Sequence, residues 1–95
     1  KMAAIAQAYN CAVIPHAWGS GIGLAAALQF VASLPPTPVC DTPVELMLEF
    51  DQSSHPFRLD LINDGIVEDG YIYVPDKPGI GVDVNLDILE KYSVK

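Results

Sequence analysis

Apolar positions along this chain follow two different periods. Over residues 22–34 they recur every three or four positions, which predicts an amphipathic helix packed on a sheet. The stripe consists of Leu24, Ala27, Leu28, Val31 and Leu34. The glycine-rich stretch 19–23 predicts a turn before this helix, with Ser20 as its N-cap. The sequence PPTP ends the helix because proline cannot continue it.

Two short apolar runs flank this helix. The run CAVIPHA at 11–17 is typical of a strand buried on both faces of a parallel sheet, and VELMLEFD at 44–51 predicts a second strand. A strand, a helix and a strand form a βαβ unit, in which the strands are parallel and the crossover is right-handed. The Ala-rich residues 1–10 predict the end of a helix that begins before residue 1, with Asn10 as its C-cap.

The rest of the chain has weaker periodicity. The polar stretch 52–65, which contains His55, is expected to run over the surface. Residues 70–84 predict a strand, a loop rich in Pro and Gly, and another strand. Residues 85–95 predict a short helix with Asn85 as its N-cap. A βαβ unit with two strands leaves its edges uncovered, so we expect these residues to belong to something larger or to pair with another chain.

Composition argues against several classes of partner. The chain is 51% apolar, has a formal net charge of -7 and contains five Lys and Arg residues. Nucleic acids and anionic membranes need clustered basic side chains, so neither is an expected partner. No apolar stretch reaches the ~20 residues that span a bilayer, so no transmembrane helix is expected. Cys11 and Cys40 have no metal-site or redox spacing, which predicts reduced, partly buried thiols and a cytoplasmic location.

A histidine and a glutamate occupy corresponding places in the two predicted strands. His16 lies at the carboxyl end of the first strand and Glu49 at the carboxyl end of the second. In α/β folds the chemistry sits at these strand ends, so the two side chains could face one pocket, with His16 as a general base. A histidine that is hydrogen-bonded there for structural reasons alone is the competing interpretation.

The glycines of the turn suggest a second class of site. Gly19, Gly21 and Gly23 precede a helix, whose first N–H groups attract anions. A dinucleotide fingerprint requires a glycine where this chain has Leu24, and no Gly-Lys-Ser/Thr sequence is present. A substrate carboxylate near the turn, or glycines that serve only the turn, therefore fit better than a nucleotide.

Three segments together resemble a known family. They are IPHAWGSGIGLAAALQFVASLP, then LMLEFD, then DGYIYVPDKPGIGVDV followed by a helix with Tyr92. The chain resembles the carboxyl-terminal portion of the enolase superfamily, of the mandelate racemase and muconate lactonizing type, which includes acid-sugar dehydratases. The resemblance implies an α/β fold: 1–51 as the carboxyl-terminal part of a modified TIM barrel, (β/α)₇β, and 52–95 returning to an α+β capping domain.

The resemblance also implies a chemistry. Such enzymes abstract the proton next to a carboxylate and hold the enediolate on Mg²⁺. His16 matches the base, Glu49 matches the acidic residue that hydrogen-bonds the substrate carboxylate, and Trp18 would line the pocket. The Mg²⁺ ligands of the family lie on upstream strands, so no metal ligand is expected in this chain. Its acidic loop residues are expected to be a solvated face; they are Asp60, Asp64, Glu68 and Asp69.

The implied reaction is dehydration of a sugar acid to a 2-keto-3-deoxy acid. A racemase, an epimerase or a cycloisomerase with the same base is the alternative within the superfamily. A non-catalytic βαβ module for binding or assembly is the alternative outside it. The resemblance further implies a homo-oligomer of the full-length chain, and residues 1–95 alone are expected to be inactive.

Overall fold

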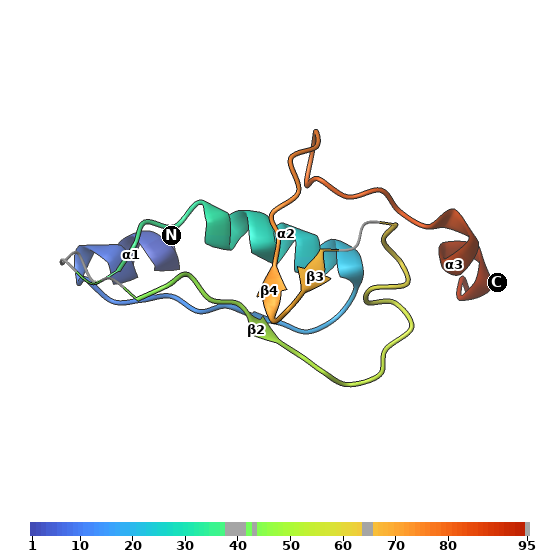
Figure 1. The fold of residues 1–95 in the computed structure, drawn as a ribbon, viewed down its shortest axis with the longest axis horizontal. Helices are drawn as coiled ribbons and strands as arrows, with labels where there is room; N and C mark the ends of the chain where they lie inside the picture. Colours follow the sequence, from blue (N-terminus) through green and yellow to red (C-terminus); the bar gives the residue numbers. More distant parts are fainter. Residues whose placement is uncertain (38–41, 43, 64–65, 95) are drawn as a thin grey trace.

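The computed structural model describes residues 1–37, 42, 44–63 and 66–94 (Figure 1). Cys40 and Asp64, which the sequence analysis singled out, lie outside the described residues. The elements in chain order are α1 (Met2–Ala8), β1 (His16–Ala17), α2 (Gly21–Ala32), β2 (Glu49–Phe50), β3 (Val67–Glu68), β4 (Tyr71–Ile72) and α3 (Leu86–Lys91).

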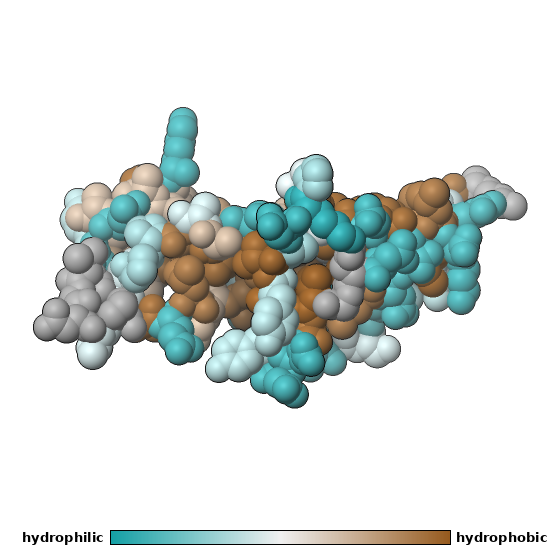
Figure 2. Space-filling view, turned by 45° about the horizontal axis from the view of Figure 1, so that its top comes forward, coloured by the Kyte–Doolittle hydropathy of each residue, from teal (hydrophilic) through white to brown (hydrophobic). Residues whose placement is uncertain are grey.

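The molecule is elongated. Its principal extents are 50 × 28 × 27 Å and its radius of gyration is 15.1 Å, against ~13 Å for a compact domain of ~100 residues. Helix α2 lies in the middle, with α1 and α3 towards opposite ends (Figure 1). Apolar surface runs across the middle of the molecule between polar patches (Figure 2). Large apolar side chains such as those of Met2 and Leu86 are exposed, so the described residues leave much apolar surface uncovered.

The C-cap of α1 is Tyr9 and not Asn10, so the predicted C-cap is wrong by one residue, and Asn10 instead holds the position that follows the cap. Asn10 follows the last helical turn with a φ of 55°, the left-handed conformation that asparagine tolerates. Its N–H donates to the Gln7 carbonyl at 2.9 Å, and the Cys11 N–H donates to the Ala6 carbonyl at 2.9 Å. This pair of bonds is a Schellman motif. The free Cys11 is exposed, so the expectation of partial burial is wrong for this thiol, because it lies beyond the helix end.

Helix α2 follows the predicted stripe closely. The side chain of Ser20 accepts a hydrogen bond from the Gly23 N–H, which confirms the predicted N-cap. Leu24, Leu28 and Val31 are buried as predicted, whereas Ala27 and Leu34 of the stripe are half-buried. Ala25 is buried in addition. The helix therefore turns the predicted stripe towards the core, whereas its apolar residues Ile22 and Phe30 are exposed.

Strands β1 and β2 pair in parallel, as the βαβ pattern predicts. His16 is the register partner of Glu49, and Ala17 that of Phe50. The paired segments are much shorter than the predicted strands 11–17 and 44–51. Pro15 has no N–H to donate, which stops the ladder from continuing before His16, although its carbonyl accepts from the Glu49 N–H at 3.1 Å.

The stretch 52–65 does not simply run over the surface, which corrects that prediction. Leu61 is 2% exposed and Ile62 is 5% exposed. Ile62 belongs to the core cluster, in which the other buried members are Leu24, Leu28 and Ile66. The reason is that α2 offers an apolar face with too little strand to cover it, so these two apolar residues fill the space.

A hairpin that the pattern did not predict follows this stretch. Strands β3 and β4 pair antiparallel across Asp69 and Gly70, which have φ values of 50° and 81°. Positive φ at both central residues is the signature of a type I′ turn, for which Asp-Gly is a preferred sequence. The strand predicted at the end of 70–84 is wrong in extent, because Val84 forms only an isolated bridge with Ile62 in the described structure.

Helix α3 begins as predicted. The Asn85 side chain accepts a hydrogen bond from the Ile88 N–H at 3.3 Å and caps the helix. Within the described residues, no helix has the length and apolar content needed to cross a lipid bilayer.

Candidate functional site

The pairing of β1 with β2 brings His16 and Glu49 together, as the sequence predicts, and each is the first residue of its two-residue strand. The His16 Nδ1 atom lies 3.3 Å from the Glu49 Oε2 atom. The side chains are 57% and 64% exposed. Leu48 and Phe50, on either side of Glu49, pack against the core, so the strand alternation directs Glu49 outward. An imidazole and a carboxylate are thus held side by side where a ligand can reach both.

Trp18 lies two residues after His16 and is 65% exposed. Side chains at positions i and i+2 of an extended chain point to the same side. The Trp18 ring meets the His55 ring edge-on, with centroids 5.5 Å apart and an interplanar angle of 72°. The structure therefore adds His55, half-buried rather than a free surface residue, to the neighbourhood of the predicted site residues.

A buried arginine, whose role was not predicted from the sequence, holds the loop after β2 in place. Arg58 is 5% exposed. Its guanidinium donates to the carbonyls of Asp51 at 2.7 Å and Ser53 at 2.8 Å, and pairs with the Asp51 carboxylate. Residues 51–58, called here the clamp loop, are thereby fixed directly after the strand that carries Glu49. No local pattern marks such a role, because the carbonyl partners come together only in the folded loop.

The clamp loop also shifts the acidity of Asp51. Hydrogen bonds from the Ser53 hydroxyl and the Ser53 N–H, together with the Arg58 guanidinium, lower the pKa of Asp51 to about 2, although burial opposes them. Asp51 is therefore a charged anchor of the loop and a poor proton donor or acceptor near neutral pH. The acid–base candidates that remain beside it are His16 and Glu49.

The glycines in the first turn of α2 allow the clamp loop to pack closely against the helix. The Gly21 N–H donates to the Phe57 carbonyl at 2.7 Å, and the Gly23 N–H donates to the Ser20 hydroxyl at 3.2 Å. A Cβ atom on Gly21 would lie 2.1 Å from the Arg58 carbonyl oxygen. Two of the N–H groups that would bind a phosphate are thus already hydrogen-bonded within the protein. A glycine is required at position 21 because the backbone of Arg58 approaches it closely. This arrangement favours a structural turn over a nucleotide site.

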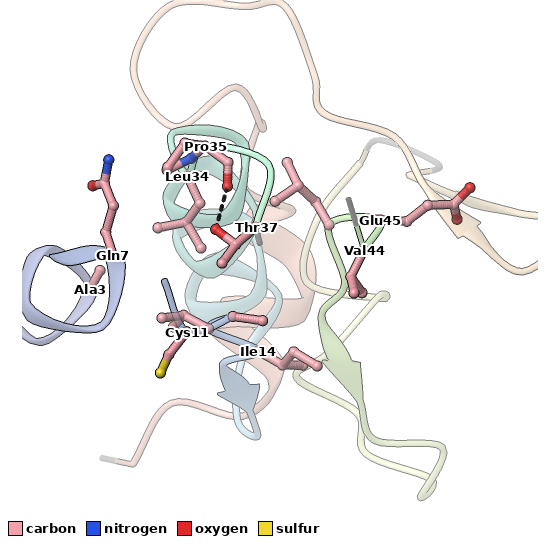
Figure 3. A pocket seen from close by; sticks show the side chains of 12 residues that line it. Ala3, Gln7, Cys11, Ile14, Leu34, Pro35, Thr37, Val44 and Glu45 are labelled. Atoms are coloured by element: carbon pink, nitrogen blue, oxygen red, sulfur yellow. Dashed lines mark hydrogen bonds between the residues drawn. The ribbon is translucent and has the colours of Figure 1, made fainter. Parts of the chain in front are cut away.

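Two hollows lie at opposite ends of the strand pair. One, of about 250 Å³, lies at the carboxyl end of β2 and is lined by the clamp loop, including His55 and Arg58. The other, of about 20 Å³, is lined by residues of α1, by the segment that follows α2 and by the segments that lead into β1 and β2 (Figure 3). It lies at the amino ends of the strands and has room for about one water molecule. The larger hollow is lined by Phe50, which follows Glu49, and by His55, which contacts Trp18, but not by His16, Trp18 or Glu49 themselves.

The described residues do not fit a Mg²⁺ site by themselves. Among them, no three His, Cys, Asp or Glu side chains lie close enough together to hold a metal ion. Mg²⁺ prefers oxygen ligands in octahedral geometry, and the pair at the strand ends offers one carboxylate and one imidazole. The acidic residues Asp60, Glu68 and Asp69 are exposed, as the expectation of a solvated face requires.

Comparisons with known proteins agree with this arrangement. Residues 1–88 match the family model of the enolase C-terminal domain-like proteins. The chain is 38% identical over 95 residues to the D-galactarolactone cycloisomerase of Agrobacterium fabrum. It is 30% identical over 96 aligned positions to the D-xylonate dehydratase of Haloferax volcanii. The solved structure of the 3,6-anhydro-D-galactonate cycloisomerase from Zobellia galactanivorans superimposes with a TM-score of 0.76 at 38% identity.

The chain spans about a quarter of these relatives. It aligns over 99% of its own length with 25% of the cycloisomerase of Agrobacterium fabrum, and over its whole length with 21% of the dehydratase. For the solved structure the shares are 99% of this chain and 24% of that chain. The similarity therefore concerns one segment of each of these enzymes.

Proposed function

The chain belongs to the enolase C-terminal domain-like family, and from this premise we propose that it forms the carboxyl-terminal part of an enzyme that abstracts the proton next to a carboxylate. The observation that carries the proposal is the juxtaposition of His16 and Glu49, 3.3 Å apart where two short parallel strands pair and lead into loops. Strand ends of this kind are where α/β enzymes hold their reacting groups.

In this proposal His16 is the general base. Its imidazole is exposed at the site, and imidazole is the side chain that most often serves as a general base. Glu49, when protonated, donates a hydrogen bond to a carboxylate oxygen of the substrate, which stabilises the charge that develops there. Trp18 lines the same side of the site and offers an apolar ring to the carbon face of the substrate.

The substrate is a sugar acid and the reaction is a dehydration. His16 takes the proton from the carbon next to the carboxylate, which leaves an enediolate. The protonated imidazole then returns this proton to the leaving hydroxyl on the next carbon, and water departs. The resulting enol rearranges to a 2-keto-3-deoxy acid. The similarity to a D-xylonate dehydratase supports this choice.

Cycloisomerisation is the second candidate. The observation in its favour is that two of the similar enzymes are cycloisomerases, each 38% identical to this chain. His16 would again abstract the proton in the first step, and the intermediate would then expel a ring oxygen in place of a hydroxyl. A racemase or an epimerase would use His16 in a comparable way.

We assign residues 1–51 to a (β/α)₇β barrel and 52–95 to the return towards a capping domain. The parallel pairing of β1 with β2 across α2 supports the barrel assignment, as does the apolar surface that the described residues leave uncovered. In the full-length protein, which we expect to be a homo-oligomer, other strands would cover that surface. Members of the enolase superfamily typically use Mg²⁺. Because the described residues form no such site, its ligands would lie on those other strands.

The test uses the full-length protein with Mg²⁺ and a panel of sugar acids and sugar lactones. Formation of 2-keto-3-deoxy acids and exchange of the α-proton with deuterium oxide are both measured for the protein and for His16→Asn. We expect exchange and product in the protein and neither in the variant. Formation of keto acid from the lactones but not from the open sugar acids would favour the cycloisomerase. Undiminished exchange in His16→Asn would remove His16 from the reaction, and no exchange with any substrate would favour a non-catalytic βαβ module.

A further inference from the structure

Trp18 lies at the edge of the candidate site, and its ring packs against the ring of His55. A tryptophan that is 65% exposed has several staggered rotamers open to it unless a contact selects one. The contact with His55 does this: the centroid distance of 5.5 Å and the angle of 72° lie in the range that aromatic pairs prefer for edge-to-face packing.

His55 is itself fixed in the clamp loop. Its Nδ1 atom accepts a hydrogen bond from the Phe57 N–H at 3.2 Å, so the neutral ring carries its proton on Nε2. The Phe57 carbonyl accepts from the Gly21 N–H at 2.7 Å, which ties the loop to the start of α2. The His55 ring therefore has a backbone anchor on one side and Trp18 on the other.

The row of rings continues to the last helix. His55 and Phe57 have ring centroids 6.1 Å apart, and Phe57 and Tyr92 have centroids 5.0 Å apart. Tyr92 is the C-cap residue of α3. The rings of Trp18, His55, Phe57 and Tyr92, called here the aromatic row, thus join the end of β1 to the end of α3.

We propose that His55 is a positioning residue that orients Trp18 and so shapes the wall of the site beside His16. The proposal rests on the proposed function in one respect, namely that Trp18 contacts the substrate. His55 holds the indole in one orientation before the substrate arrives, so the substrate does not have to order that ring on binding. The effect of His55 on the reaction passes through Trp18.

Two substitutions separate the role of the His55 ring from the role of its hydrogen-bond acceptor. His55→Asn keeps an acceptor for the N–H two residues further on, as asparagine does in Asx turns, but removes the ring that contacts Trp18. His55→Phe keeps a ring and removes the acceptor. Both are made in the full-length protein, and again with Trp18→Ala. If His55→Phe does not fold, His55→Asn decides alone, because it preserves the turn.

The first readout is independent of activity. The near-ultraviolet circular dichroism of Trp18 is obtained as the difference between each protein and its Trp18→Phe counterpart. We expect His55→Asn to lose most of this Trp18 signal and His55→Phe to keep it. An unchanged Trp18 signal in His55→Asn would overturn the proposal, since the ring of His55 would then not hold the indole.

The second readout is the split between KM and kcat on the sugar acid that the protein turns over. We expect His55→Asn to raise KM about 2- to 10-fold, the size of one aromatic pair, and to change kcat less than about twofold. In the Trp18→Ala background His55→Asn should have no further effect. An equal rise of KM in that background would overturn the proposal. A protein that turns over no sugar acid would overturn the proposed function instead, while the Trp18 signal still decides the role of His55.

Discussion

The Nδ1 atom of His16 lies 3.3 Å from the Oε2 atom of Glu49, and the two residues are register partners across a parallel strand pair. Neighbouring strands lie ~4.8 Å apart, so the pairing itself brings these side chains within reach. The backbone hydrogen bond from the Glu49 N–H to the Pro15 carbonyl, 3.1 Å long, holds that register. The geometry of the His16–Glu49 pair therefore follows from the pairing of the two strands.

We expect both His16 and Glu49 to be needed for turnover. In the full-length protein, His16→Asn is expected to lower kcat about 10²- to 10⁴-fold, the contribution of a general base. Glu49→Gln is expected to lower kcat/KM about 10- to 100-fold, because it weakens a hydrogen bond to a charged group. The matched control is Glu68→Gln, an exposed strand glutamate in β3, which should be indistinguishable from the unaltered protein. Equal rates for Glu49→Gln and Glu68→Gln would contradict a role for Glu49.

The two glycines at the start of α2 should respond to alanine in opposite directions. Gly21→Ala would place a Cβ atom 2.1 Å from the Arg58 carbonyl, so it should lower the free energy of unfolding by about 1–3 kcal/mol or more. A Cβ atom on Gly23 would lie 3.7 Å from the Ser20 Oγ atom, an ordinary van der Waals contact. Gly23→Ala should therefore raise the free energy of unfolding by about 0.4–1 kcal/mol. Denaturant unfolding of both variants checks this. Equal shifts would mean that the clamp loop does not pack on Gly21.

The clamp loop should weaken in acid. The pKa of Asp51 is lowered from 3.8 to about 2, and a carboxyl lowered in the folded state stabilises the fold above its unfolded pKa. That stabilisation is lost as the pH falls from 3.8 through about 2. The difference in free energy of unfolding between the protein and Asp51→Asn should therefore shrink across this interval. Asp60→Asn, at an exposed loop position, serves as the control, and a difference that stays constant down to pH ~2 would contradict the prediction.

The turn between β3 and β4 should depend on its glycine. Gly70 has a φ of 81°, so Gly70→Ala should destabilise the hairpin by about 1–2 kcal/mol. The local measurement is amide exchange of Tyr73, whose N–H donates to the Ile66 carbonyl at 2.7 Å. Exchange should become faster in Gly70→Ala and stay unchanged in Asp69→Asn, since asparagine also suits this turn. Equal protection in all three proteins would mean that the turn tolerates a side chain at Gly70.

Periodicity predicted the parts of the fold in which burial repeats regularly. The stripe that contains Leu24, Leu28 and Val31 extends over several turns of helix, and the sequence therefore identifies both the helix and its buried face. Leu61 and Ile62 follow a brief alternation of apolar and charged residues at 57–60, which is too short to predict which of them become buried. They become buried only because α2 supplies a partner face. The Asp69–Gly70 pair is a hairpin signal in the sequence. The prediction instead assigned Asp69 to a solvated loop, so it missed this turn.

The candidate site likewise contains some residues whose positions could be predicted from the sequence and others whose positions could not. His16 and Glu49 could be predicted to meet because parallel strands align their carboxyl ends, a rule that needs only the order of elements. Arg58 and His55 could not, because their roles depend on contacts within a folded loop and across to Trp18. A polar residue in a loop has the same local pattern whether it is solvated or buried.

The register of β2 also determines which changes of length this chain can accept. Leu48 and Phe50 face the core while Glu49 faces outward, so a single residue inserted between Val44 and Glu49 would move an apolar side chain into the place of the carboxylate. Substitutions in this segment leave the alternation intact, whereas an odd insertion or deletion inverts it. Among homologous proteins, we therefore expect the length of the segment before Glu49 to vary less than its composition.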